Sequence, residues 1–131
     1  MPVGRMNIYR LTNADLARAY RRFNRLYFGN RLPKDTVVRF SSCREGRREY
    51  LGFTMRCAKY RVIAGKSDAV AVGTTRFRII LNQRHRRRSI ALPTLLHEMV
   101  HVENYEWYNH GKKFDARMLR LAEAGAFNGL W

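Results

Sequence analysis

The chain has 131 residues, 46% of them hydrophobic, and a formal net charge of +16 at pH 7. This length predicts one domain, spanning residues 1–131, with enough apolar residues for a core. Only two cysteines are present, which excludes a disulfide framework. The sequence has no apolar signal core and no run of membrane-spanning length. We therefore expect a cytoplasmic protein, or one of the nucleoid or nucleus, with no membrane partner.

A first helix is predicted within residues 11–33, "LTNADLARAYRRFNRLYFGNRLP". Thr12 can cap its N-terminus with Asp15 three residues later, and Gly29 is placed to end it before Pro33. Apolar residues at helical spacing predict its buried face: Leu16, Ala19, Tyr20, Phe23, Leu26 and Tyr27.

The middle of the chain is predicted to be rich in strands. Arg76 and Arg78 alternate with Phe77 and Ile79, as in a strand with one buried face. The predicted strands are 36–42, 51–56 and 76–82, with weaker signals at 59–65 and 69–73. Turns are predicted at 43–50 and 65–68, and a basic connection at 83–89.

Two helices are predicted to follow. One begins between Ser89 and Pro93 and ends near Tyr108, and "NHG" separates it from another over residues 112–126. The inner face of the last helix is predicted to consist of Phe114, Met118, Leu121 and Ala122. A helix, several strands and two helices predict an α+β domain with a small antiparallel or mixed sheet.

Three of the four histidines lie in "LLHEMVHVENYEWYNHGKKF", residues 95–114. His97 and His101 are four residues apart, so they share one face of the predicted helix and can bind one zinc ion. Glu98 lies one step round the helix, beside the metal, where it can take a proton from a zinc-bound water. Its apolar neighbours predict a semi-buried site, in which neutral imidazoles need partners.

A catalytic zinc usually has a third protein ligand. The best candidate is His110, just beyond the predicted helix and followed by Gly111. By helical count, Glu103 and Glu106 point away from His101. Tyr105 and Tyr108 lie nearer the histidine face and can either hydrogen-bond a bound carbonyl or pack.

"LLHEMVH" followed by "HGKKF" resembles the motif of the SprT-like (Spartan-type) metallopeptidases, H-E-x-x-H and then H-G-x-x-F. "YFGNRLP" and "RIILN" resemble further segments of that family, so the likeness runs from about Leu16 to Leu121. It implies a zincin-like metallopeptidase core, with His97, His101 and His110 as zinc ligands and Glu98 as general base. The metzincin pattern does not fit, because Asn104 and Trp107 occupy its glycine and histidine positions.

The chain departs from the family in two places. Lys112 and Lys113 stand where many members have Pro-Glu, and Cys43 and Cys57 cannot build the four-cysteine zinc ribbon of many bacterial members. A minimal catalytic core is expected, a form that would suit a viral or mobile-element protein. Spartan-type members act on proteins attached to DNA, which favours DNA over RNA as the partner here.

The 26 Lys and Arg residues against 10 acidic ones predict that this core itself binds nucleic acid through its phosphates. Arginine is favoured for that task because it grips phosphate with two hydrogen bonds. The candidate arginines form three groups: Arg18, Arg21, Arg22 and Arg25; Arg44, Arg47 and Arg48; and Arg84, Arg86, Arg87 and Arg88. A highly soluble surface without such a partner is the alternative interpretation of the charge.

The leading prediction is a zinc-dependent endopeptidase that acts on nucleic-acid-associated proteins. Residues 76–82 are a candidate strand to run along the cleft and pair with the substrate backbone. Two other functions remain open. One is a non-catalytic zinc-containing nucleic-acid-binding protein, and the other is a basic RNA-binding protein without metal.

Overall fold

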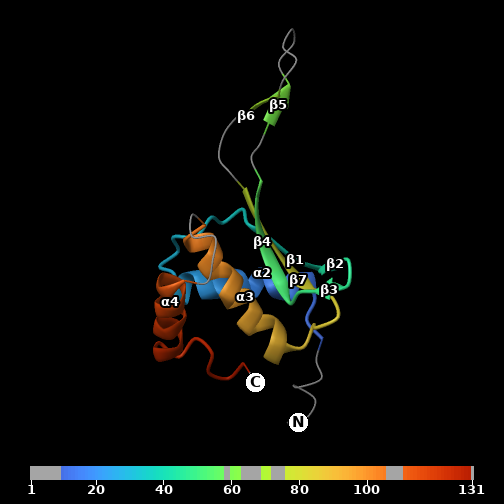
Figure 1. Cartoon of the computed structure of the whole chain (residues 1–131). Helices are drawn as coiled ribbons and strands as arrows, with labels where there is room; N and C mark the ends of the chain where they lie inside the picture. The colour runs from blue at the N-terminus through green and yellow to red at the C-terminus, as the bar shows by residue number, and fades with distance from the viewer. Residues whose placement is uncertain (1–9, 58–59, 63–68, 72–75, 106–110, 131) are drawn as a thin grey trace.

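The computed structural model describes residues 10–57, 60–62, 69–71, 76–105 and 111–130 (Figure 1). Within these residues, one helix precedes the strands and two follow them, so the predicted α+β class is confirmed. The elements are α2 (Asn13–Tyr27), β1 (Val37–Ser41), β2 (Arg44–Glu45), β3 (Arg48–Glu49), β4 (Gly52–Cys57), β5 (Tyr60–Val62), β6 (Ala69–Ala71), β7 (Arg76–Asn82), α3 (Arg88–Glu103) and α4 (Lys112–Glu123).

The main sheet is mixed, with the strand order β1-β7-β4. The central strand β7 runs parallel to β1 and antiparallel to β4. Its residues Ile79, Ile80 and Leu81 are all buried, as expected for a strand covered on both faces. The idea that residues 76–82 pair with a substrate is wrong, because both edges of β7 already have partner strands. The local sequence pattern could not reveal which strand is central.

The start and end of α2 follow the prediction. Thr12 and Asp15 form a capping box, and Gly29 ends the helical segment with a φ of +59°. Leu26, predicted to be buried, is 50% exposed, whereas Asn24 is buried. The Asn24 side chain bonds both the N–H and the C=O of Leu32. These bonds shift the buried arc of the helix towards Asn24 and away from Leu26.

Residues 43–50 form more than the predicted turn. Arg44 and Glu45 pair antiparallel with Glu49 and Arg48 in a short hairpin, β2–β3. Gly46 in its turn has a φ of +60°, a backbone conformation that residues other than glycine rarely adopt. The two weaker strand predictions correspond to β5 and β6, which pair antiparallel with each other.

The helix α3 is the central helix of the fold and contacts β4, β7, α2 and α4. Leu95, Leu96, Met99 and Val100 are fully buried on it. It begins at Arg88 but ends at Glu103, earlier than predicted. The C-cap Asn104 has a non-helical backbone, and its side-chain amide donates to Glu103 Oε1 at 3.2 Å.

The last helix, α4, packs on α3 through Phe114 and Leu121, with Met118 partly buried. Ala122, predicted to face inward, is exposed. Arg117 occupies the other edge of the inner face, and its guanidinium lies 4.9 Å from the ring centroid of Phe28. Within the described ranges, none of the helices has both the length and the apolar character needed to cross a bilayer.

Candidate metal centre

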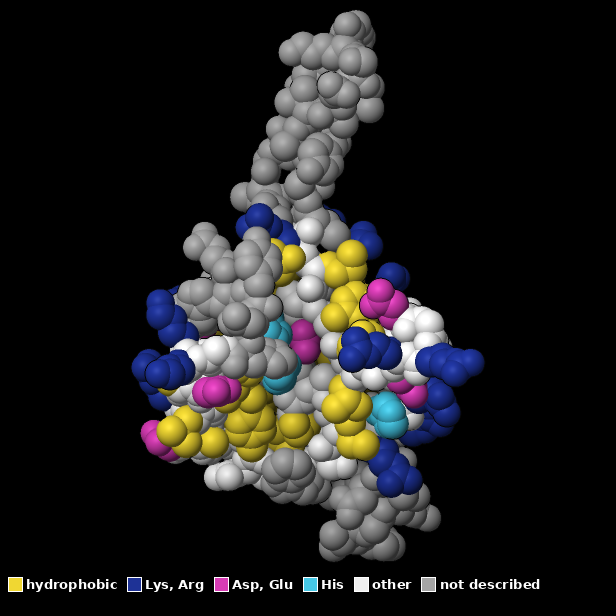
Figure 2. Space-filling model, viewed as in Figure 1, with side chains coloured by type: hydrophobic (Ala, Val, Ile, Leu, Met, Phe, Trp, Pro, Cys, Tyr) yellow, Lys and Arg dark blue, Asp and Glu magenta, His cyan; other side chains and the backbone are white. Residues whose placement is uncertain are grey.

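The structure brings His97, Glu98 and His101 together on α3. Their possible ligand atoms all lie within 4.8 Å of one another, and the two imidazole centroids are 5.1 Å apart. Both histidines are half-buried, whereas Glu98 is only 4% exposed. Figure 2 shows histidine and acidic side chains next to each other near the middle of the viewed face. The spacing of four residues therefore produces the shared face that the sequence predicted.

The carboxyl group of Glu98 is held from the sheet. Thr54 on β4 donates its hydroxyl to Glu98 Oε1 at 2.8 Å, and the same hydroxyl lies 3.2 Å from the Glu98 backbone oxygen. The other carboxyl oxygen, Oε2, lies 3.9 Å from His97 Nε2. Burial raises the pKa of Glu98 to about 7, although the Thr54 hydrogen bond acts in the opposite direction. One oxygen is thus anchored while the other faces the histidines.

Phe114 packs against the histidine pair. Its ring centroid lies 4.8 Å from that of His97 and 4.7 Å from that of His101, and it stacks on His101 at an interplanar angle of 29°. The sequence placed Phe114 on an inner face and in a motif, but it did not predict this contact. Such packing restricts the rotation of both imidazoles.

The strand β4 lies very close to α3 at this point. A Cβ added to Gly52 would meet Leu81 Cδ2 at 2.9 Å, the backbone oxygen of Ile80 at 3.0 Å and Thr94 Cγ2 at 3.1 Å. Thr94 is one helical turn before Glu98, and Thr54 is two residues after Gly52. The absence of a side chain at Gly52 therefore permits the approach that places Thr54 against Glu98.

Thr54 is the residue of this centre that sequence analysis missed. It lies 44 residues before Glu98 in the chain, and a threonine in a strand carries no signal of such a contact. Only the register of the sheet, in which Thr54 is opposite Ile79, places it beside α3.

The other residues considered for the site lie in different surroundings. Glu103 is engaged elsewhere, since its carboxylate accepts from Arg117 Nε at 2.7 Å and Arg31 Nη2 at 3.1 Å. Tyr105 packs edge-on to Phe77 with centroids 5.3 Å apart, which agrees with the packing alternative. The predicted third ligand His110 lies outside the described residues, as do Glu106 and Tyr108.

The arginine run before α3 does not form one patch. Arg84 pairs with Glu49 at 3.5 Å, and Arg88 donates to the backbone oxygen of Gly129 at 3.4 Å. Arg86 lies over the ring of Phe40, 4.7 Å from its centroid. Arg87 is the N-cap residue of α3 and forms a β-bridge with Arg10. The side chains of Arg84, Arg86 and Arg88 thus contact different parts of the fold.

The other candidate arginines lie on two separate elements. Arg18 is paired with Asp15. The remaining candidates are exposed, on α2 (Arg21, Arg22 and Arg25) and on the β2–β3 hairpin (Arg44, Arg47 and Arg48).

Protein-family models, curated proteins and solved structures offer no match to this chain. The chemistry of the site is therefore inferred from its own residues and geometry.

Proposed function

We propose that the protein is a zinc-dependent endopeptidase of the SprT-like type, with a zincin-like core, that acts on nucleic-acid-associated proteins. The observation that carries the proposal is the cluster of two imidazoles and one buried carboxyl group within 4.8 Å on α3. A net charge of +16 supports a nucleic-acid partner, DNA before RNA.

The donor set fits zinc. Imidazole nitrogens are preferred zinc ligands, and helical residues four apart can direct both to one ion. His97 and His101 would hold the metal, and His110 is the third ligand that the family motif implies. When bound, zinc would act as a Lewis acid that polarises the scissile carbonyl.

Glu98 is suited to move the proton. A general base works best when its pKa lies near the working pH. Burial raises the pKa of Glu98 to about 7 in the metal-free protein, and a bound cation would lower it from there. Thr54 anchors Oε1, so Oε2 on the histidine side is the atom that would accept a proton from the attacking water and pass it to the leaving amine. A purely structural zinc site needs neither a buried carboxyl group nor its anchor.

The substrate chain would lie along β4 instead of β7. Among the described strands, β4 is an edge of the main sheet, with β7 on its other side. A peptide can add to such an edge through backbone hydrogen bonds. Leu51, Phe53 and Met55 are exposed there, at 52%, 36% and 43%, and they alternate with Gly52 and Thr54, which lie next to α3. Apolar substrate side chains would contact this exposed row.

A non-catalytic zinc protein that binds nucleic acid is the second candidate, favoured by the charge alone. One experiment separates the two. Zinc content and cleavage of a disordered protein are measured with and without single- or double-stranded DNA. Glu98→Gln should retain zinc and lose cleavage by about 10²–10⁴-fold, the usual contribution of a general base.

The controls use residues outside the cluster. Glu45 is exposed, so Glu45→Gln should cleave normally. His97→Ala, His101→Ala and His110→Ala should lower zinc affinity, whereas His85→Ala should not. Near wild-type cleavage by Glu98→Gln would refute the mechanism. Zinc binding with no cleavage by the wild type would favour the second candidate.

A further inference from the structure

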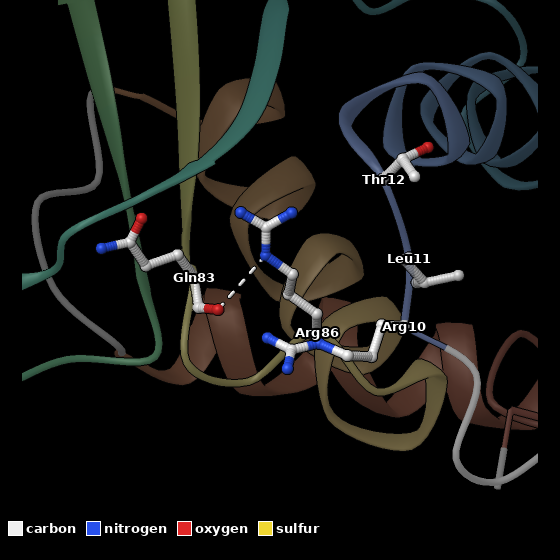
Figure 3. Close-up of a pocket in the computed structure, with 5 residues that line it drawn as sticks. All are labelled: Arg10, Leu11, Thr12, Gln83 and Arg86. Carbon is white, nitrogen blue, oxygen red and sulfur yellow. Dashed lines mark hydrogen bonds between the residues drawn. The ribbon is translucent and has the colours of Figure 1, made fainter.

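A pocket lies between the chain segment that leads into α2 and the connection from β7 to α3 (Figure 3). Its volume is about 440 Å³, and it is lined by Arg10, Leu11, Thr12, Gln83 and Arg86. The two walls are tied together, because Leu11 N–H donates to the Arg86 backbone oxygen at 2.9 Å and Arg10 forms a β-bridge with Arg87. Residues far apart in the chain therefore form one fixed site.

The pocket concentrates positive charge. Figure 3 shows the guanidinium groups of Arg10 and Arg86 between Gln83 and the segment of Leu11 and Thr12. Arg86 is oriented by its Nε, which donates to the Gln83 backbone oxygen at 3.2 Å, and by the ring of Phe40. In the part of the chain that the structure describes, no carboxylate pairs with either arginine. Two unpaired like charges at one cavity favour binding of an anion.

Asp15, the acidic residue nearest in sequence to Thr12 of the pocket, already has hydrogen-bond partners on both carboxylate oxygens. Asp15 Oδ2 accepts from the backbone N–H of Thr12 at 2.7 Å and from its hydroxyl at 3.0 Å, while Oδ1 accepts from Arg18. These bonds hold the pKa of Asp15 below its ordinary value, and Arg18 offsets its charge. The carboxylate therefore closes the capping box of α2 and does not neutralise the pocket.

We propose that this pocket binds a phosphate group of a nucleic-acid backbone. Guanidinium groups match phosphate oxygens with two hydrogen bonds each. The volume leaves room for the neighbouring sugar. The inference rests on the nucleic-acid partner of the proposed function, but not on its protease chemistry.

The location connects the pocket with the metal centre. Arg88 and His97 are nine residues apart on α3, which is about 14 Å along the helix at 1.5 Å per residue. The helix α3 begins two residues after Arg86 and carries the metal centre. Arg86 then differs from Arg84 and Arg88, whose contacts lie elsewhere.

The test measures binding of a fluorescent oligo(dT) strand across a series of salt concentrations. Arg10→Gln with Arg86→Gln is compared with Lys112→Gln plus Arg120→Gln, which removes the same charge from exposed positions on α4. The pocket variant should lose about tenfold or more in affinity, the usual effect of losing charged hydrogen bonds. Its salt slope should fall by about 0.7 for the phosphate released. The control should keep the slope and change affinity by less.

Thermal unfolding of each variant shows whether it is folded. If the double variant does not fold, Arg10→Gln alone is used, because Arg10 is exposed; unchanged oligonucleotide binding by it would overturn the proposal. Equal losses of oligonucleotide affinity in the pocket and control variants would overturn the assignment of the pocket as a phosphate site, but not the binding of nucleic acid. A wild type that binds no oligonucleotide would also remove the nucleic-acid partner, and peptide cleavage tests the protease independently.

The second arm of the experiment uses inorganic phosphate, first titrated into the protein by itself and then added to the protein with bound oligonucleotide. Phosphate should compete with the oligonucleotide in the wild type and not in the pocket variant. Phosphate binding that disappears in the pocket variant while oligonucleotide binding is unchanged would assign the pocket to a free phosphate ion and overturn the nucleic-acid assignment.

Discussion

The buried carboxyl group of Glu98 should make the stability of the metal-free protein depend on pH. Burial raises the pKa of Glu98 from 4.5 to about 7, so the folded protein holds the proton more tightly than the unfolded chain does. The resulting stability is complete below pH 4.5 and is lost as pH rises through 7. The difference corresponds to about 3 kcal/mol, at roughly 1.4 kcal/mol for each tenfold change in proton affinity.

Replacing Glu98 with glutamine removes the charge and keeps an acceptor for the Thr54 hydroxyl. We expect the free energy of unfolding of Glu98→Gln, minus that of the wild type, to rise by about 3 kcal/mol as pH increases from 4.5 to above 7. Urea unfolding at several pH values, with a chelator present, measures both proteins. The difference cancels the groups that titrate independently of Glu98. Glu45→Gln, at an exposed position, should show no such rise.

A difference that stays constant with pH would refute the reasoning, because it would mean that water hydrates the ionised carboxylate. Zinc gives a further check. A cation beside the carboxylate favours the ionised form, so added zinc should make the loss of stability in the wild type smaller and end it at a lower pH. The same addition should not create a pH dependence of this kind in Glu98→Gln.

Two other predictions concern contacts that connect distant segments. Thr54→Val removes the hydrogen bond that lowers the pKa of Glu98, so the pH range over which stability is lost should extend to higher pH. Thr54→Ser keeps the hydroxyl and should leave that range unchanged. An unchanged range in both variants would count against the anchor. Glu103→Ala leaves the half-buried Arg117 without its carboxylate partner and should cost about 2 kcal/mol in urea unfolding. Arg31→Ala, at a 69% exposed side chain, should cost less than about 1 kcal/mol, and equal costs would contradict this interpretation.

Several features were determined by the sequence itself, because they depend on residues close together in the chain. His97 and His101 share a face because a helix repeats every 3.6 residues. Thr12 and Asp15 close the capping box three residues apart. Gly29 adopts the positive φ that ends the first helical segment. The α+β class likewise follows from the order of the elements.

Other features were decided only when separate segments packed together. Helical spacing leaves the edges of a buried face undetermined. Leu26 and Ala122 were therefore predicted to be buried but are exposed, because the contacts of each helix with its neighbours set the edges of the buried face. Alternation in residues 76–82 could not indicate that β7 has a partner on each side. The anchor of Glu98 by Thr54, the packing of Phe114 on the histidines and the meeting of Arg10 with Arg86 each join residues from separate elements. Sheet register and helix packing set such contacts, and a local sequence pattern contains neither.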